Sequence, residues 1–131
     1  ILLHIWKFKI ASTQAIRHFL FKDSSLYAIY RRLYRMEKSK YVEVNFAKRG
    51  KHQFWTLTKL GYEAIEDLLP QLKEKGFKSE SPMHDLIASA IHVADHDYCK
   101  TNNIRTFTEQ ELRRIDINFY PENIPRTDRH R

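Results

Sequence analysis

The chain has 131 residues, which is long enough for one domain. Its residues are 42% hydrophobic and 13% aromatic, enough to form a hydrophobic core. Its formal net charge of +7 at pH 7 favours a polyanionic partner, whereas its single cysteine excludes an internal disulfide framework. No apolar run approaches the length of a membrane span, so we expect a cytoplasmic protein that is not associated with a membrane.

The positive charge is concentrated in the first part of the chain. Residues 1–80 hold sixteen Lys and Arg against eight Asp and Glu, whereas residues 81–131 hold seven against eight. A change of composition at 73–82, with glycine, serine and proline among charged residues, is typical of a linker. We therefore expect a basic DNA-binding domain at 1–72 and a second, incomplete part at 83–131.

Two short helices are predicted at the start of the chain. Residues 1–8 carry apolar side chains at helical spacing. Because this run resembles the middle of a helix, we expect the native start of the protein to be missing. A short break follows at 10–12, and Ser12 or Thr13 can cap the second helix. The apolar residues of that helix are Ala15, Ile16, Phe19 and Leu20.

A third helix, with Ser24 as its expected N-cap, runs to about Lys38 and is basic and amphipathic. Its apolar side comprises Leu26, Ile29, Tyr30, Leu33 and Met36. The opposite side comprises Ser24, Tyr27, Ala28, Arg31, Arg35 and Lys38. Arg31 and Arg35 lie one turn apart, where they are well placed to contact guanine edges or phosphates. An ordinary solvated helix face is the alternative. Together with the helix before it, this helix predicts a helix-turn-helix.

The segments 41–46 and 52–57 alternate apolar and polar residues, which predicts a β-hairpin. The turn between them contains Gly50 and three cations: Lys48, Arg49 and Lys51. A turn with no binding role would be expected to mix Asn, Asp and Ser. Three cations directly after a basic helix favour contact with phosphates or with the minor groove of DNA.

Thr58 is the expected cap of a fourth helix. The apolar side of that helix comprises Ala64, Ile65, Leu68 and Leu69. Farther on, the pattern predicts a helix at 83–100, a strand at 104–107 and a short helix with a capping box at 108–114. The expected buried side of the first of these helices comprises Leu86, Ile87, Ala90, Ile91 and Ala94. One strand cannot close a sheet domain, so this part resembles the start of an α/β domain.

The sequence offers little support for catalysis or for a metal. His92 and His96 could present two ligands on one helix face, but no further ligand follows at a recognisable spacing, and a polar helix surface is the favoured interpretation. Three glycines cannot form a phosphate-cradling loop. We expect no catalytic residue, metal ion or cofactor. Four tyrosines could stack on single-stranded bases, although double-stranded DNA is the preferred ligand: Tyr27, Tyr30, Tyr34 and Tyr41.

Two sets of residues resemble known families. Tyr-Arg-Arg-Leu-Tyr-Arg-Met at 30–36, with Phe-Trp-Thr-Leu-Thr-x-x-Gly at 54–61, resembles bacterial winged-helix proteins. His-Asp-Leu at 84–86, with Thr-Phe-Thr-Glu-Gln-Glu-Leu-Arg-Arg at 106–114, resembles the replication-relaxation family of plasmid and mobile-element proteins. These resemblances imply a mainly α fold with a small β-hairpin (α+β), in which a winged helix-turn-helix precedes the truncated start of a nuclease-like α/β domain. The acidic catalytic residues of that family follow a Pro-Asp pair that this chain does not reach, so none can be assigned.

The sequence therefore predicts double-stranded DNA binding by the recognition module of a plasmid or mobile-element replication or mobilisation protein of the relaxase type. Arg31, Arg35 and Tyr27 would enter the major groove, with Ser24 allowing close approach. Four cations would hold phosphates or the minor groove: Lys38, Lys48, Arg49 and Lys51. The alternatives are a winged-helix transcriptional regulator of bacteria, part of a DNA-nicking enzyme, and a winged helix that binds protein. The sequence allows a homodimer without requiring one.

Overall fold

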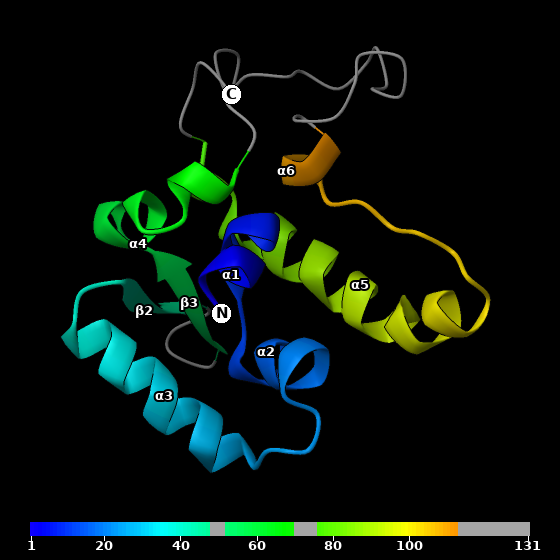
Figure 1. Cartoon of the computed structure of the whole chain (residues 1–131), viewed down its shortest axis with the longest axis horizontal. Coiled ribbons are helices and arrows are strands. Elements are labelled where there is room, and N and C mark those ends of the chain that lie inside the picture. The colour runs from blue at the N-terminus through cyan, green and yellow to red at the C-terminus, as the bar shows by residue number, and fades with distance from the viewer. Residues whose placement is uncertain (48–51, 70–75, 113–131) are drawn as a thin grey trace.

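The computed structural model describes residues 1–47, 52–69 and 76–112 and shows helices around a small antiparallel sheet (Figure 1). This mixture confirms the predicted α+β composition. The elements in chain order are α1 (Leu2–Phe8), β1 (Ile10–Ala11), α2 (Thr13–Leu20), α3 (Leu26–Lys38), β2 (Val42–Ala47), β3 (His52–Leu57), α4 (Lys59–Glu63), the 3-10 helix η1 (Glu66–Leu68), α5 (Pro82–Thr101) and α6 (Glu109–Leu112). Among the described residues, no helix combines the length and apolar composition needed to cross a membrane.

The three strands form one sheet in the order β1-β3-β2, with both pairs antiparallel. Strands β2 and β3 pair from Val42 opposite Leu57 to Ala47 opposite His52, so the predicted hairpin is confirmed. The short strand β1 places Ala11 opposite Trp55 on the other edge of β3. The turn residues Lys48, Arg49 and Lys51 lie outside the described residues.

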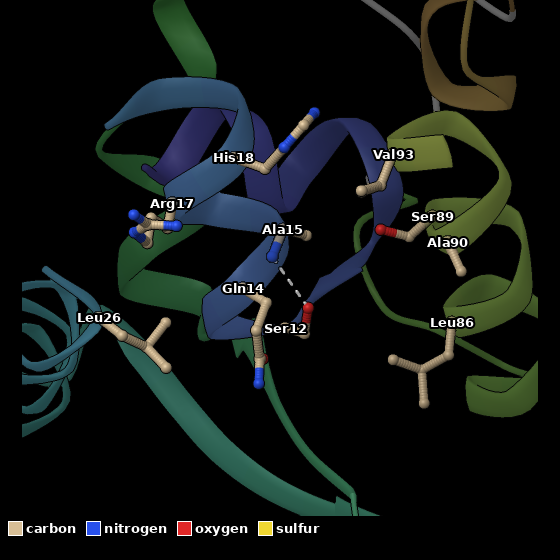
Figure 2. Close-up of a pocket in the computed structure, with 10 residues that line it drawn as sticks. All are labelled: Ser12, Gln14, Ala15, Arg17, His18, Leu26, Leu86, Ser89, Ala90 and Val93. Atoms are coloured by element: carbon tan, nitrogen blue, oxygen red, sulfur yellow. Dashed lines mark hydrogen bonds between the residues drawn. The ribbon is translucent and has the colours of Figure 1, made fainter. Parts of the chain in front are cut away.

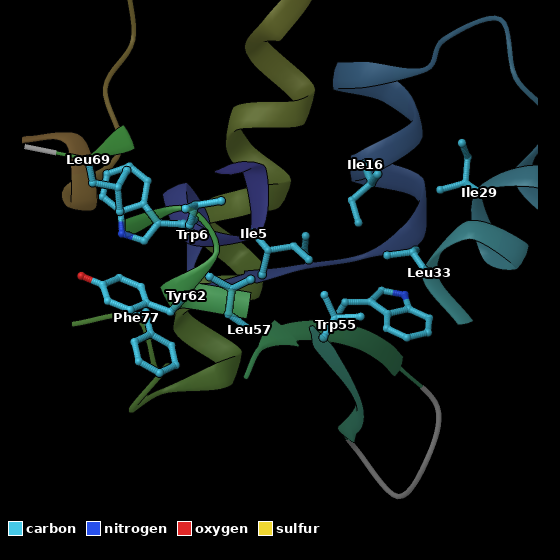
Figure 3. Packing of buried hydrophobic residues seen from close by; sticks show 13 residues of the cluster. Ile5, Trp6, Ile16, Ile29, Leu33, Trp55, Leu57, Tyr62, Leu69 and Phe77 are labelled. Carbon is cyan, nitrogen blue, oxygen red and sulfur yellow. The ribbon is translucent and has the colours of Figure 1, made fainter. Parts of the chain in front are cut away.

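The core is centred on Trp55, whose side chain is fully buried between the sheet and the helices (Figure 3). Its indole Nε1 donates a hydrogen bond of 2.9 Å to the hydroxyl of Thr13, the first residue of α2. The same cluster of buried residues holds Ile16 from α2 and Leu33 from α3. Residues far apart in sequence thus fix the position of α2 and α3 on the sheet.

Serine caps begin both of the helices that precede the hairpin. Ser12 caps α2, as one of two predicted candidates, and its hydroxyl accepts from the amide of Ala15 at 3.1 Å. The prediction of Ser24 as the cap of α3 is wrong, because the hydroxyl of Ser25 accepts from Ala28 N at 3.1 Å. The carbonyl of Ser24 instead accepts from Arg17 Nε at 2.7 Å, which ties the turn back to α2. Two adjacent serines offered the same cap, and this tertiary bond decides between them.

Thr58 caps α4 as predicted, since its hydroxyl accepts from Gly61 N at 3.0 Å. A side chain at Gly61 would place Cβ only 2.0 Å from the carbonyl oxygen of Tyr41, so only glycine fits here. The predicted apolar side of this helix is partly wrong. α4 ends at Glu63 and gives way to η1, so Ile65 and Leu69 are buried whereas Ala64 and Leu68 are exposed.

The part of the chain after the predicted linker packs against the first part. Within the stretch expected to be a linker, Phe77 is buried and its ring stacks on Tyr62 at 4.7 Å between centroids. Helix α5 contacts α2 and β1, and α2 lies between α3 and α5 (Figure 1). The predicted capping box is confirmed, because Thr108 N donates to Glu111 Oε2 at 2.8 Å and Glu111 N donates to Thr108 Oγ1 at 3.3 Å.

Two predictions for this part are wrong. Residues 104–107 form no strand, since no described strand lies beside them to complete the backbone hydrogen bonds. The expected buried side of α5 largely faces outward: Ile87 and Ile91 are each 56% exposed, and Ala90 and Ala94 are also exposed. The helix buries a more polar side that includes Asp85 and Ser89.

His4 lies in an aromatic cluster between α1 and α2 and is only 6% exposed. Its ring centroid is 4.9 Å from that of Phe8 and 5.1 Å from that of Phe19. Burial, assisted by the positive charge of Lys7, lowers the pKa of His4 from 6.5 to about 4.

Acid should therefore destabilise the fold through His4. The unfolded chain binds a proton at this residue below pH 6.5, whereas the folded chain does not until about pH 4. The stabilising contribution is thus complete above pH 6.5 and is lost as the pH falls toward 4, by up to about 3 kcal/mol. We expect His4→Phe to flatten this part of the pH dependence in urea unfolding, and His52→Gln, at an exposed position, to leave it unchanged. Equal slopes for the wild type and His4→Phe would contradict this account.

Candidate nucleic-acid interface

The exposed side of α3 carries alternating aromatic and basic residues along its length. Tyr27, Arg31, Tyr34 and Lys38 recur at intervals of three or four residues, so they fall on one face of the helix. Tyr27 is 71% exposed and Tyr34 is 48% exposed. The opposite side buries Ile29 and Leu33 in the core. The predicted amphipathic division of this helix is therefore confirmed.

Arg31 and Arg35 are exposed on this helix, one turn apart. The guanidinium carbon of Arg31 lies 5.9 Å from the centre of the Tyr27 ring, close enough for a cation–π contact. Among the described residues, no carboxylate lies within ion-pair distance of Arg31, Arg35 or Lys38. These cations therefore keep their hydrogen-bonding capacity for an external anion.

Arg32, in contrast, belongs to a different side of α3. Its guanidinium carbon lies 5.3 Å from the centre of the Phe21 ring, in the turn that joins α2 to α3. It also lines a shallow groove with Ile1, Leu2 and Met36. Arg32 consequently provides a basic residue of the same helix that does not share the face of Tyr27 and Arg31.

Tyr34 joins the basic face of α3 to the hairpin, a role that sequence reasoning missed. Its hydroxyl accepts a hydrogen bond of 3.2 Å from Gln53 Nε2 on β3. Its ring meets Trp55 edge-on, with 5.4 Å between centroids. The spacing of Tyr34, three residues after Arg31 and four before Lys38, could have indicated its place on the exposed face, but its contact with Gln53 has no signal in the sequence.

The structure brings four of the eight predicted DNA-binding residues together on α3: Tyr27, Arg31, Arg35 and Lys38. Ser24 lies just before the helix, half buried, with its carbonyl bonded to Arg17. The remaining three, Lys48, Arg49 and Lys51, lie outside the described residues. Of the strands that flank them, β2 contacts α3, and Gln53 of β3 is hydrogen-bonded to Tyr34 of the same helix.

A cavity of about 510 Å³ lies between α2 and α5, near the start of α3 (Figure 2). The pattern of residues does not by itself indicate a ligand pocket in this part of the chain. The wall of the cavity is mainly apolar, with polar groups from α2 and α5. The lining residues are Ser12, Gln14, Ala15, Arg17, His18, Leu26, Leu86, Ser89, Ala90 and Val93.

No protein-family model, curated protein or solved structure matches the chain. The geometry of α3, the hairpin and the surrounding charges is therefore the basis on which a function is inferred.

Proposed function

We propose that the chain binds double-stranded DNA as a winged helix, with α3 in the major groove and the β2–β3 hairpin beside it. The observation that carries this proposal is the contact between the hairpin and the exposed basic face of α3, where the hydroxyl of Tyr34 accepts a hydrogen bond from Gln53 on β3. A short helix, a tight turn and a longer exposed helix are also the order of a helix-turn-helix.

In this proposal Arg31, Arg35 and Tyr27 contact base edges, while Lys38 contacts a phosphate. A guanidinium can form two hydrogen bonds with the O6 and N7 atoms of guanine, and the tyrosine ring offers an apolar surface beside it. Lys48, Arg49 and Lys51, in the turn of the hairpin, supply further phosphate or minor-groove contacts. The concentration of positive charge in residues 1–80 supports a polyanionic partner for this part of the chain.

For the biological role, we propose the recognition module of a plasmid or mobile-element replication or mobilisation protein. The support is the resemblance of the segments at 84–86 and 106–114 to the replication-relaxation family. A transcriptional regulator is the second candidate, and the cavity between α2 and α5 favours it, because a ligand bound there would adjoin the helix that leads into α3. Loss of DNA binding on addition of a small molecule would favour the regulator.

Titration of a fluorescent 20-base-pair duplex with the chain tests the proposal. About five phosphate contacts would give a slope of log affinity against log salt near −4.5, and a loss of roughly 500-fold between 50 and 200 mM salt. A duplex enriched from a random library should also bind more tightly than an unselected one. Binding without salt dependence, or equal affinity for single strands and duplex, would contradict a double-stranded DNA function.

A further inference from the structure

Three potential metal ligands from two helices converge beside the cavity: His18 of α2, and His96 and Asp97 of α5. One ligand atom from each residue lies within 4.8 Å of the other two. On the sequence alone, only His92 and His96 stand out as a possible ligand pair, since they share a helix face, and a polar helix surface is the favoured interpretation there; His18 is distant in the chain. The fold replaces His92 with His18 as the neighbour of His96.

His18 has an unsatisfied nitrogen directed into this cluster. Its Nε2 atom is buried and has no hydrogen-bond partner among the described residues. The closest acidic oxygen, Oδ1 of Asp97, is 3.9 Å away, too far for a hydrogen bond but close enough for both atoms to ligate one ion after a small side-chain movement. A buried imidazole nitrogen without a partner is costly, and a metal ion would satisfy it.

The ring of Phe19 packs against both imidazole rings. The centroid of His96 lies 4.6 Å from that of Phe19, and the centroid of His18 lies 5.6 Å from it, both in edge-on geometry. The centroids of the two imidazole rings are 5.5 Å apart, and these rings also meet edge-on. This packing restricts the rings before any ion binds, which lowers the entropic cost of forming a site.

We propose that His18, His96 and Asp97 form a zinc-binding site that joins α2 to α5. Two imidazoles and one carboxylate are a ligand set that suits Zn²⁺, with water in the fourth, open position. The ion would link the first helix of the pair α2–α3 to the second part of the chain. This inference is independent of the proposed DNA function.

Lys22 supplies a specific consequence of this proposal. Its ammonium lies 3.8 Å from the same Oδ1 atom of Asp97 that would ligate the ion, so the two cations compete for one carboxylate. Removing the charge with Lys22→Met should therefore raise the affinity for zinc. A cluster with only a structural role would show no such gain.

Isothermal titration of the metal-free chain with Zn²⁺ tests the proposal. We expect one ion per chain, a rise in the unfolding temperature with zinc, and a tetrahedral absorption spectrum with Co²⁺ as a probe. His18→Gln, His96→Gln and Asp97→Asn should each lower the affinity by more than about tenfold, while Lys22→Met should raise it.

Two histidines serve as matched controls. His52→Gln removes an exposed histidine of β3. His92→Gln removes the histidine that lies one turn before His96; the ring of His92 packs edge-on against Phe8. Both variants should bind zinc like the wild type. Asp97 is largely exposed, so Asp97→Asn remains informative if a histidine variant fails to fold. Absence of zinc binding by the wild type, or wild-type affinity in Asp97→Asn, would overturn the proposal.

Discussion

The double variant Arg31→Ala/Arg35→Ala should lose preferential binding to a selected duplex while keeping its fold. Both side chains are exposed on α3 and form no ion pair with a described residue. Each bidentate arginine contact with a base contributes about 1–3 kcal/mol of discrimination, so losing two should weaken specific binding by roughly 30-fold to 10⁴-fold. Alanine is a strong helix former, and the stability of the fold should change by less than about 1 kcal/mol.

Fluorescence anisotropy with the enriched duplex and with an unselected duplex measures this loss, and circular dichroism checks the fold. Arg32→Ala is the matched control, because it removes an arginine from the same helix that packs on Phe21 instead of lying with Tyr27 and Arg31. It removes one positive charge, against two in the double variant, so it should lower the affinity for both duplexes equally and leave their ratio unchanged. A folded double variant that retains the wild-type preference would exclude α3 as the reading element.

The helices and strands of the first part were predictable because their local patterns agree with their tertiary environment. In α3 the helical spacing of apolar residues separates buried Ile29 and Leu33 from exposed Arg31 and Arg35. The hairpin, from its alternating pattern, and the cap at Thr58 could likewise be predicted from the sequence. The sequence could not show which of Ser24 and Ser25 caps α3, because this depends on the hydrogen bond from Arg17 Nε to the carbonyl of Ser24.

Helix α5 shows why its buried side could not be predicted. Periodicity selects the most apolar side, yet the helix places Asp85 and Ser89 against the rest of the protein. Asp85 is accommodated by a bond of 2.5 Å from the hydroxyl of Ser79 and by His84 Nδ1 at 3.1 Å. Such pairing offsets part of the cost of burying a carboxylate, and no hydrophobicity pattern reports it. A hydrophobicity pattern does not indicate the proposed zinc site either, because one of its three ligands, His18, comes from α2 and the other two come from α5.

Trp55 should be the residue whose loss costs the fold most among those of the core. It is fully buried in the central strand, opposite Ala11 on one side and Val44 on the other. Trp55→Ala should lower the free energy of unfolding by about 3–5 kcal/mol, a large part of the 5–15 kcal/mol typical of a domain. In urea unfolding followed by circular dichroism, we expect a much lower midpoint or no folded baseline.

Its hydrogen bond with Thr13 can be separated from its volume by a double-mutant cycle. Trp55→Phe keeps an aromatic ring but leaves the Thr13 hydroxyl without this donor, and Thr13→Val leaves the buried indole N–H unpaired. Each single variant should lower the free energy of unfolding by about 1–3 kcal/mol. The double variant removes both polar partners and leaves neither buried without a hydrogen bond. Its loss of stability should therefore be smaller than the sum of the two single losses by about 1 kcal/mol. Strictly additive losses would show that packing alone, without the bond from the sheet to α2, holds the helix pair in place.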